Sequence, residues 1–334
     1  MSGHPTMTDV AERAGVSRAL VSIVFRDVAG ASEQTRERVR AAADALGYLP
    51  DRRARSLSRR RTRVLGVAFA LGHEFHADLM AGLYRAAASH DQELALSGTT
   101  AERDESEAVA DLLALRCDAL LLLGPALSEE ALDRLSANVP TVVVARAAAG
   151  LQVDVVRTDD VAGAALAARH LIDLGHTRLV NVDGGTAAGA EERRRGFAAT
   201  VDQAGLGLAS TELGGLTEDE GAAAADRLLA RHDRPTGVAV FNDQSAAGLM
   251  DVLQQAGLRW PEDLSVVGYD DSRLARSRWA RLTTVRQDVD TLARLAVLRA
   301  VERVDEPALP ARQDLVAPRL VVRASTGPPP APRP

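Results

Sequence analysis

Short apolar segments alternate with longer helix-forming segments through most of this chain. The apolar segments predict eight strands, at residues 64–70, 93–98, 118–123, 141–145, 179–183, 237–241, 264–269 and 282–285. Strands separated by helices form parallel sheets with helices on their faces. No long linker interrupts the region, so we expect an α/β body of two similar lobes. A ligand crevice is expected at the C-terminal ends of the strands.

Composition excludes several classes of protein. The chain has 334 residues, enough for two or three domains, and contains no lysine. A Walker A loop, a Schiff-base lysine and a protein kinase are therefore excluded. The single cysteine, Cys117, excludes a disulfide scaffold and a cysteine-based zinc site. No apolar segment long enough to span a membrane and no signal-peptide pattern is present, so we expect an intracellular protein. We expect no cofactor and no metal.

Charge is distributed unevenly along the chain. Residues 1–63 contain 13 Arg and 7 acidic residues, a net charge of +6, whereas the remainder carries a net charge of −12. A small basic segment on a large acidic body is typical of a polyanion-binding region. A solvated charged surface is the alternative, and charge alone does not separate the two.

The basic segment has the pattern of three helices. Apolar residues at helical spacing predict a first helix that begins after Thr6 and ends at Ala14, followed by Gly15-Val16-Ser17 as a turn. A second helix is predicted over 18–25 and a third over 32–46. Two short helices joined by a tight turn with Gly form a helix-turn-helix, whose second helix can enter the major groove of DNA.

The segments around this pattern make it specific. The motifs are TMTDVAERAGVS, ALVS, GASEQTRERVRAAADALGYLPD and the arginine-rich RRARSLSRRRTRVLGV, in that order. With them the chain resembles the LacI/GalR (lactose-repressor) family of bacterial transcription regulators. Further motifs of the family follow in the body, namely DDVAG, HLIDLGH, FNDQSA, LSVVGYDD and LTTVRQ, so the resemblance spans nearly the whole chain.

The resemblance implies the domain organisation. Residues 1–50 are expected to form the helix-turn-helix domain, 51–62 a hinge helix and linker, and 63–325 a periplasmic-binding-protein-like body. The chain is expected to cross between the lobes near residues 157, 286 and 316. The N-lobe then comprises about 63–157 and 286–316, and the C-lobe about 158–285 and 317–325. The proline-rich tail, 326–334, is expected to be disordered.

The resemblance also implies which residues contact DNA. Arg18, Ala19 and Ile23 fall where family members contact base edges, and Arg18 could donate two hydrogen bonds to a guanine. Thr8, Ser17, Ser22 and Thr35 are candidates for phosphate contacts. The hinge candidates are Arg52, Ala54, Arg55 and Leu57. Leu57 is the one large apolar residue between Pro50 and Val64, and the family places its leucine in the minor groove, where an apolar wedge kinks DNA.

Effector-binding residues are likewise carried over from the family. Residues at the positions of Arg193, Asn242 and Asp270 bind the effector there, and their groups suit hydroxyls. Phe75 and Gln287 are further candidates. A surface or strand-end polar group is the alternative for each. Ala145 stands where the family often has aspartate, and aromatic residues are only 3% of the chain. The effector therefore stays open among a sugar, a sugar phosphate, a nucleobase and another small polar molecule.

Together these features predict a ligand-responsive transcription regulator in the cytoplasm, bound to the nucleoid when on DNA. It is expected to be a repressor that binds a palindromic DNA operator as a homodimer. A solute-binding protein of a transporter shares the two-lobe body, but the basic segment and the missing signal peptide disfavour it. An enzyme is disfavoured because the glycine-rich loop at 184–189 has no lysine and no nucleophile has a plausible base. His170 and His176 lack the partners of a metal site.

Overall fold

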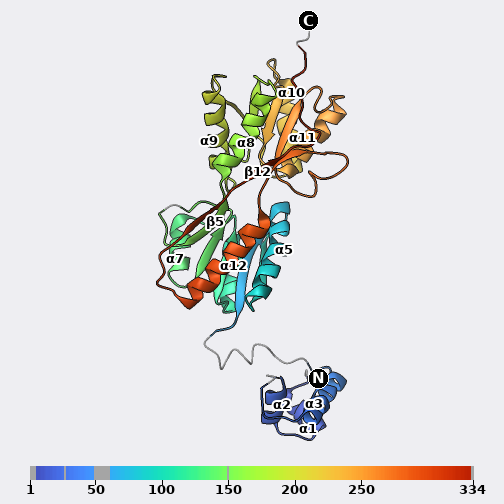
Figure 1. Ribbon diagram of the computed structural model, residues 1–334, viewed down its shortest axis with the longest axis vertical. Helices are drawn as coiled ribbons and strands as arrows, with labels where there is room; N and C mark the ends of the chain where they lie inside the picture. The colour runs from blue at the N-terminus through green and yellow to red at the C-terminus, as the bar shows by residue number, and fades with distance from the viewer. Residues whose placement is uncertain (1–4, 26–27, 49–60, 149, 332–334) are drawn as a thin grey trace. The chain divides into compact units, whose positions relative to one another are not determined.

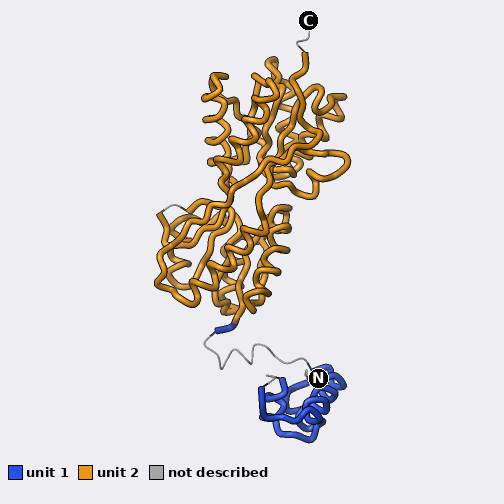
Figure 2. The backbone as a smooth tube through the Cα atoms, viewed as in Figure 1, with its two compact units in different colours: residues 1–62 blue, residues 63–334 orange. Residues whose placement is uncertain are grey.

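The structure is a computed structural model that describes residues 5–25, 28–48, 61–148 and 150–331. The chain divides into two compact units, residues 1–62 and 63–334 (Figure 2). We refer to them as the N-terminal unit and the body.

The N-terminal unit is a bundle of three helices, α1 (Met7–Ala14), α2 (Arg18–Phe25) and α3 (Glu33–Leu46). Helix α1 begins with a capping box, in which the side chains of Thr6 and Asp9 each accept a hydrogen bond from the other's backbone N–H. It ends at Gly15, whose φ of 62° lies in the left-handed region that glycine tolerates best. This turn reverses the chain into α2 and creates the helix-turn-helix.

Small apolar side chains from all three helices form the core of this unit. Val10, Val21 and Val39 are fully buried, one from each helix. The rings of Phe25 and Tyr48 close the core with their centroids 5.7 Å apart. Because the core uses one face of each helix, the opposite faces are left for solvent or a ligand.

The N-lobe of the body is built on a parallel six-stranded sheet with the order β11-β5-β4-β3-β1-β2 (Figure 1). Its strands are β1 (Val64–Ala70), β2 (Glu93–Thr99), β3 (Ala119–Leu123), β4 (Thr141–Val144), β5 (Asp154–Thr158) and β11 (Gln313–Val316). Its helices are α5 (Glu74–Ser89), α6 (Glu105–Ala114), α7 (Glu129–Ser136) and α12 (Val289–Asp305). Helices α5 and α12 cover one face and α6 and α7 the other, so the strands are apolar on both sides.

The C-lobe repeats this plan with the strand order β12-β10-β9-β8-β6-β7. The strands are β6 (Leu179–Asp183), β7 (Ser210–Leu213), β8 (Gly237–Val240), β9 (Ser265–Asp270), β10 (Thr283–Arg286) and β12 (Arg319–Val321). All pairs are parallel except β12 with β10. Helices α8 (Asp160–Asp173) and α9 (Ala190–Gln203) cover one face, and α10 (Glu218–Ala230) and α11 (Asp243–Gln255) the other.

Three connections join the lobes, between β5 and α8, between β10 and α12, and between β11 and β12. Figure 1 shows these segments side by side at the waist of the body. The predicted fold class, a helical N-terminal domain with a two-lobe α/β body, is confirmed. Four strands, β5, β7, β11 and β12, were absent from the sequence prediction. Three of them, β7, β11 and β12, are edge strands, and β5 lies next to an edge. All four carry polar residues, so their sequences resemble loops.

The proline-rich tail differs from the expected disorder at residues 326–331. The backbone N–H of Gly327 donates to Ser265 Oγ (3.1 Å), and its carbonyl lies 2.9 Å from Nε2 of the buried His176. Thr326 Oγ1 lies 2.9 Å from a ring nitrogen of His170. Proline content removes regular secondary structure, but the remaining backbone groups still find partners on the C-lobe.

Candidate DNA-binding surface and effector cavity

Helix α2 presents part of its first turn to solvent. Val21 and Val24 are buried in the core, whereas Arg18 and Ala19 are exposed. Ser17 precedes the helix, and its Oγ accepts a hydrogen bond from the backbone N–H three residues later at 3.2 Å. This cap fixes the start of the helix. The two predicted base-contacting residues at this end therefore project from a rigidly held turn.

The other predicted DNA contacts differ in exposure. Thr8 is exposed on α1, whereas Ser22 and Ile23 are half-buried on α2. Thr35 is half-buried as well, and its hydroxyl lies 2.9 Å from that of Ser32 at the start of α3. The hinge candidates lie outside the described residues, namely Arg52, Ala54, Arg55 and Leu57.

Arg193 lies at the centre of a buried polar cluster in the C-lobe. Its Nε donates to Asp160 Oδ1 (2.9 Å) and its Nη1 donates to the carbonyl of Phe241 (2.6 Å). The guanidinium carbon lies 3.5 Å from the ring centroid of Tyr269, whose hydroxyl also donates to Asp160 Oδ1 (3.0 Å). Burial raises the pKa of Asp160, and the neighbouring Arg193 opposes that effect. The guanidinium is therefore fixed in one orientation by an ion pair and an aromatic face.

Asp270 lies at the end of β9, where the connections between the lobes meet. Its Oδ1 accepts a hydrogen bond from Gln287 Nε2 (2.7 Å), and Gln287 Oε1 accepts one from Thr158 Oγ1 (2.6 Å). Burial raises the pKa of Asp270, and Arg193 opposes this shift. This chain of bonds joins the ends of β5, β9 and β10. Gln287, which lies on the connection after β10, therefore contacts the end of β5 and a predicted effector residue.

Asn242 and Phe75 have structural partners of their own. Asn242 caps α11, because its Oδ1 accepts from the N–H of Ser245 (2.7 Å) while its Nδ2 donates to the carbonyl of Leu216 (3.0 Å). Phe75, in the first turn of α5, is buried in the N-lobe core. Both side chains border the space between the lobes. Asn242 also caps a helix, and Phe75 also fills the N-lobe core.

The five predicted effector residues meet at one small cavity. Its volume is about 30 Å³, and Phe75, Arg193, Asn242, Asp270 and Gln287 all line it. A space of this size admits water and no larger molecule. The structure therefore brings these residues together, but the main open volume lies next to them.

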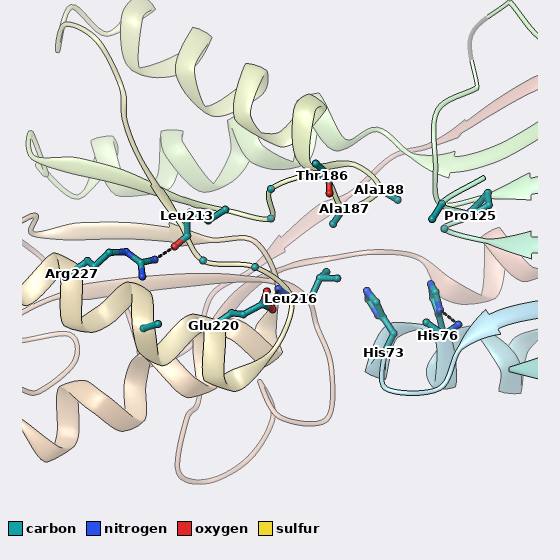
Figure 3. A pocket seen from close by; sticks show the side chains of 18 residues that line it. His73, His76, Pro125, Thr186, Ala187, Ala188, Leu213, Leu216, Glu220 and Arg227 are labelled. Carbon is teal, nitrogen blue, oxygen red and sulfur yellow. Dashed lines mark hydrogen bonds between the residues drawn. The ribbon is translucent and has the colours of Figure 1, made fainter. Parts of the chain in front are cut away.

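A cavity of about 670 Å³ opens between the lobes beside the small one (Figure 3). None of the five predicted residues lines it. The N-lobe contributes His73, His76 and Pro125, and the C-lobe contributes the loops after β6 and β7, Glu220 and Arg227. Ligand cavities in proteins have volumes of about 300–1,000 Å³. This cavity lies at the C-terminal ends of the strands, as the sequence predicted for the ligand crevice.

Two histidines on this wall were absent from the sequence prediction. His73 and His76 stack with their ring centroids 4.4 Å apart and 14° between the planes. Burial is the main cause that lowers the pKa of His73 to about 4 and that of His76 to about 3. Both rings are therefore neutral at physiological pH. Their position directly after the first strand of a parallel sheet was the available sequence signal, because ligands bind at that end.

No cluster of three or more potential metal ligands occurs in the described ranges of the chain. Within the same ranges no helix combines the length and the apolar character needed to cross a membrane.

Two known protein families match different parts of this chain. The family described as bacterial regulatory proteins of the lacI family matches residues 6–51, and a periplasmic binding protein-like domain matches residues 168–326. A helix-turn-helix unit followed by a two-lobe binding body is therefore the organisation of a bacterial regulatory protein.

A similarity that extends over nearly the whole chain identifies its family. The chain is 34% identical to the HTH-type transcriptional repressor PurR of Vibrio vulnificus, over 95% of this chain and 97% of the relative. The chain belongs to the LacI family, and the resemblance stated from its motifs is confirmed.

Solved structures of regulators from this family are similar to this chain as well. A LacI transcriptional regulator from a Rhodococcus species is 43% identical with a TM-score of 0.78, over 80% of this chain and 100% of that one. A lac repressor dimer bound to operator and an anti-inducer is 28% identical with a TM-score of 0.84, over 97% of this chain and 100% of that one.

Proposed function

We propose that the protein is a sequence-specific transcriptional repressor that binds a palindromic operator as a homodimer and responds to a small polar effector. The observation that carries this proposal is the presence of a capped helix-turn-helix and a 670 Å³ cavity between two lobes on one chain of this family. The relatives are regulators, and we infer that this chain is not an enzyme. It acts in the cytoplasm, where it associates with the nucleoid through its operator.

The helix-turn-helix supplies the sequence-specific contacts. Arg18 donates two hydrogen bonds to O6 and N7 of a guanine, while Ala19 and Ile23 offer apolar contact to thymine methyl groups. The proposed phosphate contacts, which orient the unit without reading sequence, are Thr8, Ser17, Ser22 and Thr35. The hydroxyl of Thr35 lies next to that of Ser32, so Thr35 mainly stabilises the start of α3. In the hinge, Arg52, Ala54 and Arg55 follow the minor groove and Leu57 is the wedge.

The effector acts on the waist between the lobes. Arg193 and Asp270 border the space where the lobes approach, and Gln287 links Asp270 to Thr158 at the end of β5. A ligand that bonds to these groups changes the relative closure of the lobes. The changed closure alters whether two hinge segments can meet on DNA. Operator must then change effector affinity by the same factor, because coupling between two binding sites is reciprocal.

Selection of bound duplexes from a random DNA pool tests this function. The full-length protein, at a stated near-physiological salt concentration, should enrich a palindrome with a deformable step at its centre. The half-sites should be equivalent because a homodimer carries two identical recognition helices.

The selection is repeated with pooled metabolites. Enrichment only in their presence would identify an effector that promotes DNA binding, and loss of enrichment would identify an inducer. Absence of an enriched sequence under both conditions would overturn the proposed function.

A further inference from the structure

The small and the large cavities of the body share part of their walls. Four residues, His73, His76, Gly124 and Ala188, line both. The two spaces are therefore neighbouring chambers, which we call the inner chamber (about 30 Å³) and the outer chamber (about 670 Å³). Figure 3 shows the His73 and His76 side chains projecting from the N-lobe in the same direction toward the loops of the C-lobe.

His76 is a neutral hydrogen-bond donor with a fixed tautomer. Its Nδ1 accepts a hydrogen bond from the backbone N–H of Ala70 at 3.1 Å, so the ring proton is carried by Nε2. The residue is only 5% exposed, and it lines both chambers. A Cβ on Gly124 would lie 3.3 Å from Nε2, so glycine at this position keeps the approach to the donor open.

His73 adds a second polar group at the same junction. Its ring stacks on His76, and its Nδ1 is buried without a hydrogen-bond partner in the described part of the chain. A buried polar atom without a partner costs about 1–3 kcal/mol. This atom and the Nε2–H donor of His76 both lie at the junction of the two chambers, where a ligand with hydroxyl groups gains hydrogen bonds.

The charged groups on the chamber walls already have partners within the protein. Arg193 pairs with Asp160, and Arg227 pairs with Glu212 (2.6 Å) and also donates to a carbonyl of β7. Glu220 accepts two backbone N–H groups at the start of α10 (2.8 and 2.9 Å). Arg193 and Arg227 are the arginines that line the two chambers in the described residues. A phosphate or carboxylate ligand would therefore find no uncompensated positive charge, which disfavours anionic effectors.

We propose that the outer chamber is the main effector subsite, that it takes an uncharged polyhydroxyl ligand of disaccharide size, and that His76 and His73 are its specificity-determining hydrogen-bonding residues. The inference rests on the proposed function, whose effector it narrows. A disaccharide has about two dozen non-hydrogen atoms, a size that suits a pocket of several hundred Å³, whereas a single sugar ring leaves most of the outer chamber empty. One ring occupies the outer chamber, and the other reaches the junction beside Arg193 and Asp270.

Calorimetric titration of the full-length protein tests the ligand class. The disaccharides are maltose, cellobiose, trehalose and sucrose, and the comparison ligands are glucose, glucose 6-phosphate and inosine. At least one disaccharide should bind about tenfold or more tightly than every comparison ligand. Tighter binding of glucose 6-phosphate, glucose or inosine, or no binding of any of the four disaccharides at millimolar concentration, overturns the proposal.

Two substitutions of His76 separate ligand contact from a structural role. His76→Gln places an amide near the position of Nε2 and loses the bond to Ala70, whereas His76→Asn keeps an acceptor near Nδ1 and loses the donor. We expect His76→Asn to weaken binding of the disaccharide by about tenfold and His76→Gln to change it by less than about threefold. The reverse order would show that His76 acts only through Ala70. His232→Asn, on the exposed surface of the C-lobe, is the matched control.

Operator binding separates this inference from the proposed function. The operator selected without added sugar should bind wild type, His76→Asn and His76→Gln with equal affinity. Operator binding without a disaccharide response overturns the ligand class alone, whereas absence of operator binding by the wild type overturns the function on which it rests.

Discussion

The residues expected to bind DNA and those expected to bind the effector lie in opposite physical settings. In the N-terminal unit, Arg18 and Ala19 are exposed on a helix whose other face forms the core. In the body, Arg193, Asp270 and Gln287 are buried or nearly so, and hydrogen bonds already join them to other parts of the protein. A substitution of a DNA-binding residue in the N-terminal unit should therefore change function without changing stability. A substitution of an effector residue in the body should change both.

This difference follows from what each partner supplies. DNA brings its own rigid array of base edges, and the protein needs only a held helix with side chains that reach them. A small effector must instead alter the packing of two lobes, so its contacts belong to the network that sets their geometry. Substitutions in the two regions should therefore have different stability costs.

The largest effect is expected for Arg193→Met. The substitution leaves Asp160 buried without its ionic partner and removes the cation from the face of Tyr269. We expect a loss of about 3–5 kcal/mol in the free energy of unfolding, measured by urea denaturation, because breaking a buried ion pair strands a charge.

Two further variants sharpen this result. Arg195→Met, on the same helix but with its side chain exposed, should cost less than about 1 kcal/mol. The double variant Arg193→Met/Asp160→Asn should recover part of the loss, since no charge then remains unpaired. Equal costs for Arg193→Met and Arg195→Met would contradict the coupling of function and stability in the body.

A smaller effect, on DNA binding alone, is expected for Leu57→Ala in the proposed hinge. Loss of the apolar wedge should weaken specific operator binding by the equivalent of a few kcal/mol, because the bent DNA is no longer stabilised. Salt-dependent binding to random DNA should persist, since it depends on phosphate contacts. Fluorescence anisotropy with both duplexes measures the two affinities, and equal losses on both would rule out the wedge.

Arg18→Ala should cost about 1–3 kcal/mol of operator affinity and abolish discrimination at one base pair of each half-site. The free energy of unfolding should change by less than about 0.5 kcal/mol, because the side chain is exposed. Arg13→Ala, which removes one exposed positive charge from α1, is the control and should leave base discrimination intact. A marked drop in stability for Arg18→Ala would remove the contrast between the two regions.

The sequence predicts the parts of this structure that rest on strong local patterns. Continuous apolar segments such as 119–123 are buried on both faces and stand out as strands. The second helix matches its predicted bounds, because Ser17 and the preceding Gly15 form a clear start signal. By contrast, β7 alternates half-buried and exposed residues at a sheet edge, and β12 has only three residues. Their pairing is a tertiary property without a local signal.

In the effector region, too, some features have a local sequence signal and others depend on the folded structure. Motifs locate Arg193 and Asp270, but they do not reveal that Asp160 and Gln287 occupy part of the hydrogen-bonding capacity of these residues. Nor do they reveal where open volume remains after the lobes pack. The importance of His73 and His76 depends on a cavity formed by the loops after β6 and β7, distant in sequence, so it is visible only in the folded body.

The smallest effect concerns the pH dependence of stability at the junction of the chambers. His76 has a pKa near 6.5 in the unfolded chain. In the folded protein its pKa is lowered to about 3, mainly because the ring is buried. Between these values the unfolded state binds more protons, so the stability contributed by His76 is present above pH 6.5 and is lost as pH falls. Each pH unit below 6.5 costs about 1.4 kcal/mol for this residue.

Other groups titrate in the same range, and burial raises the pKa of Asp270 and Asp160 with the opposite effect on stability. The quantity to measure is therefore the difference in the free energy of unfolding between wild type and His76→Gln. We expect this difference to shift by about 1 kcal/mol against the wild type between pH ~7 and ~5.5. The exposed His232→Asn control should follow the wild type throughout. Parallel curves for His76→Gln and wild type would show that His76 is accessible to protons in the folded state, and a protonated ring could not remain the neutral donor inferred for the effector chamber.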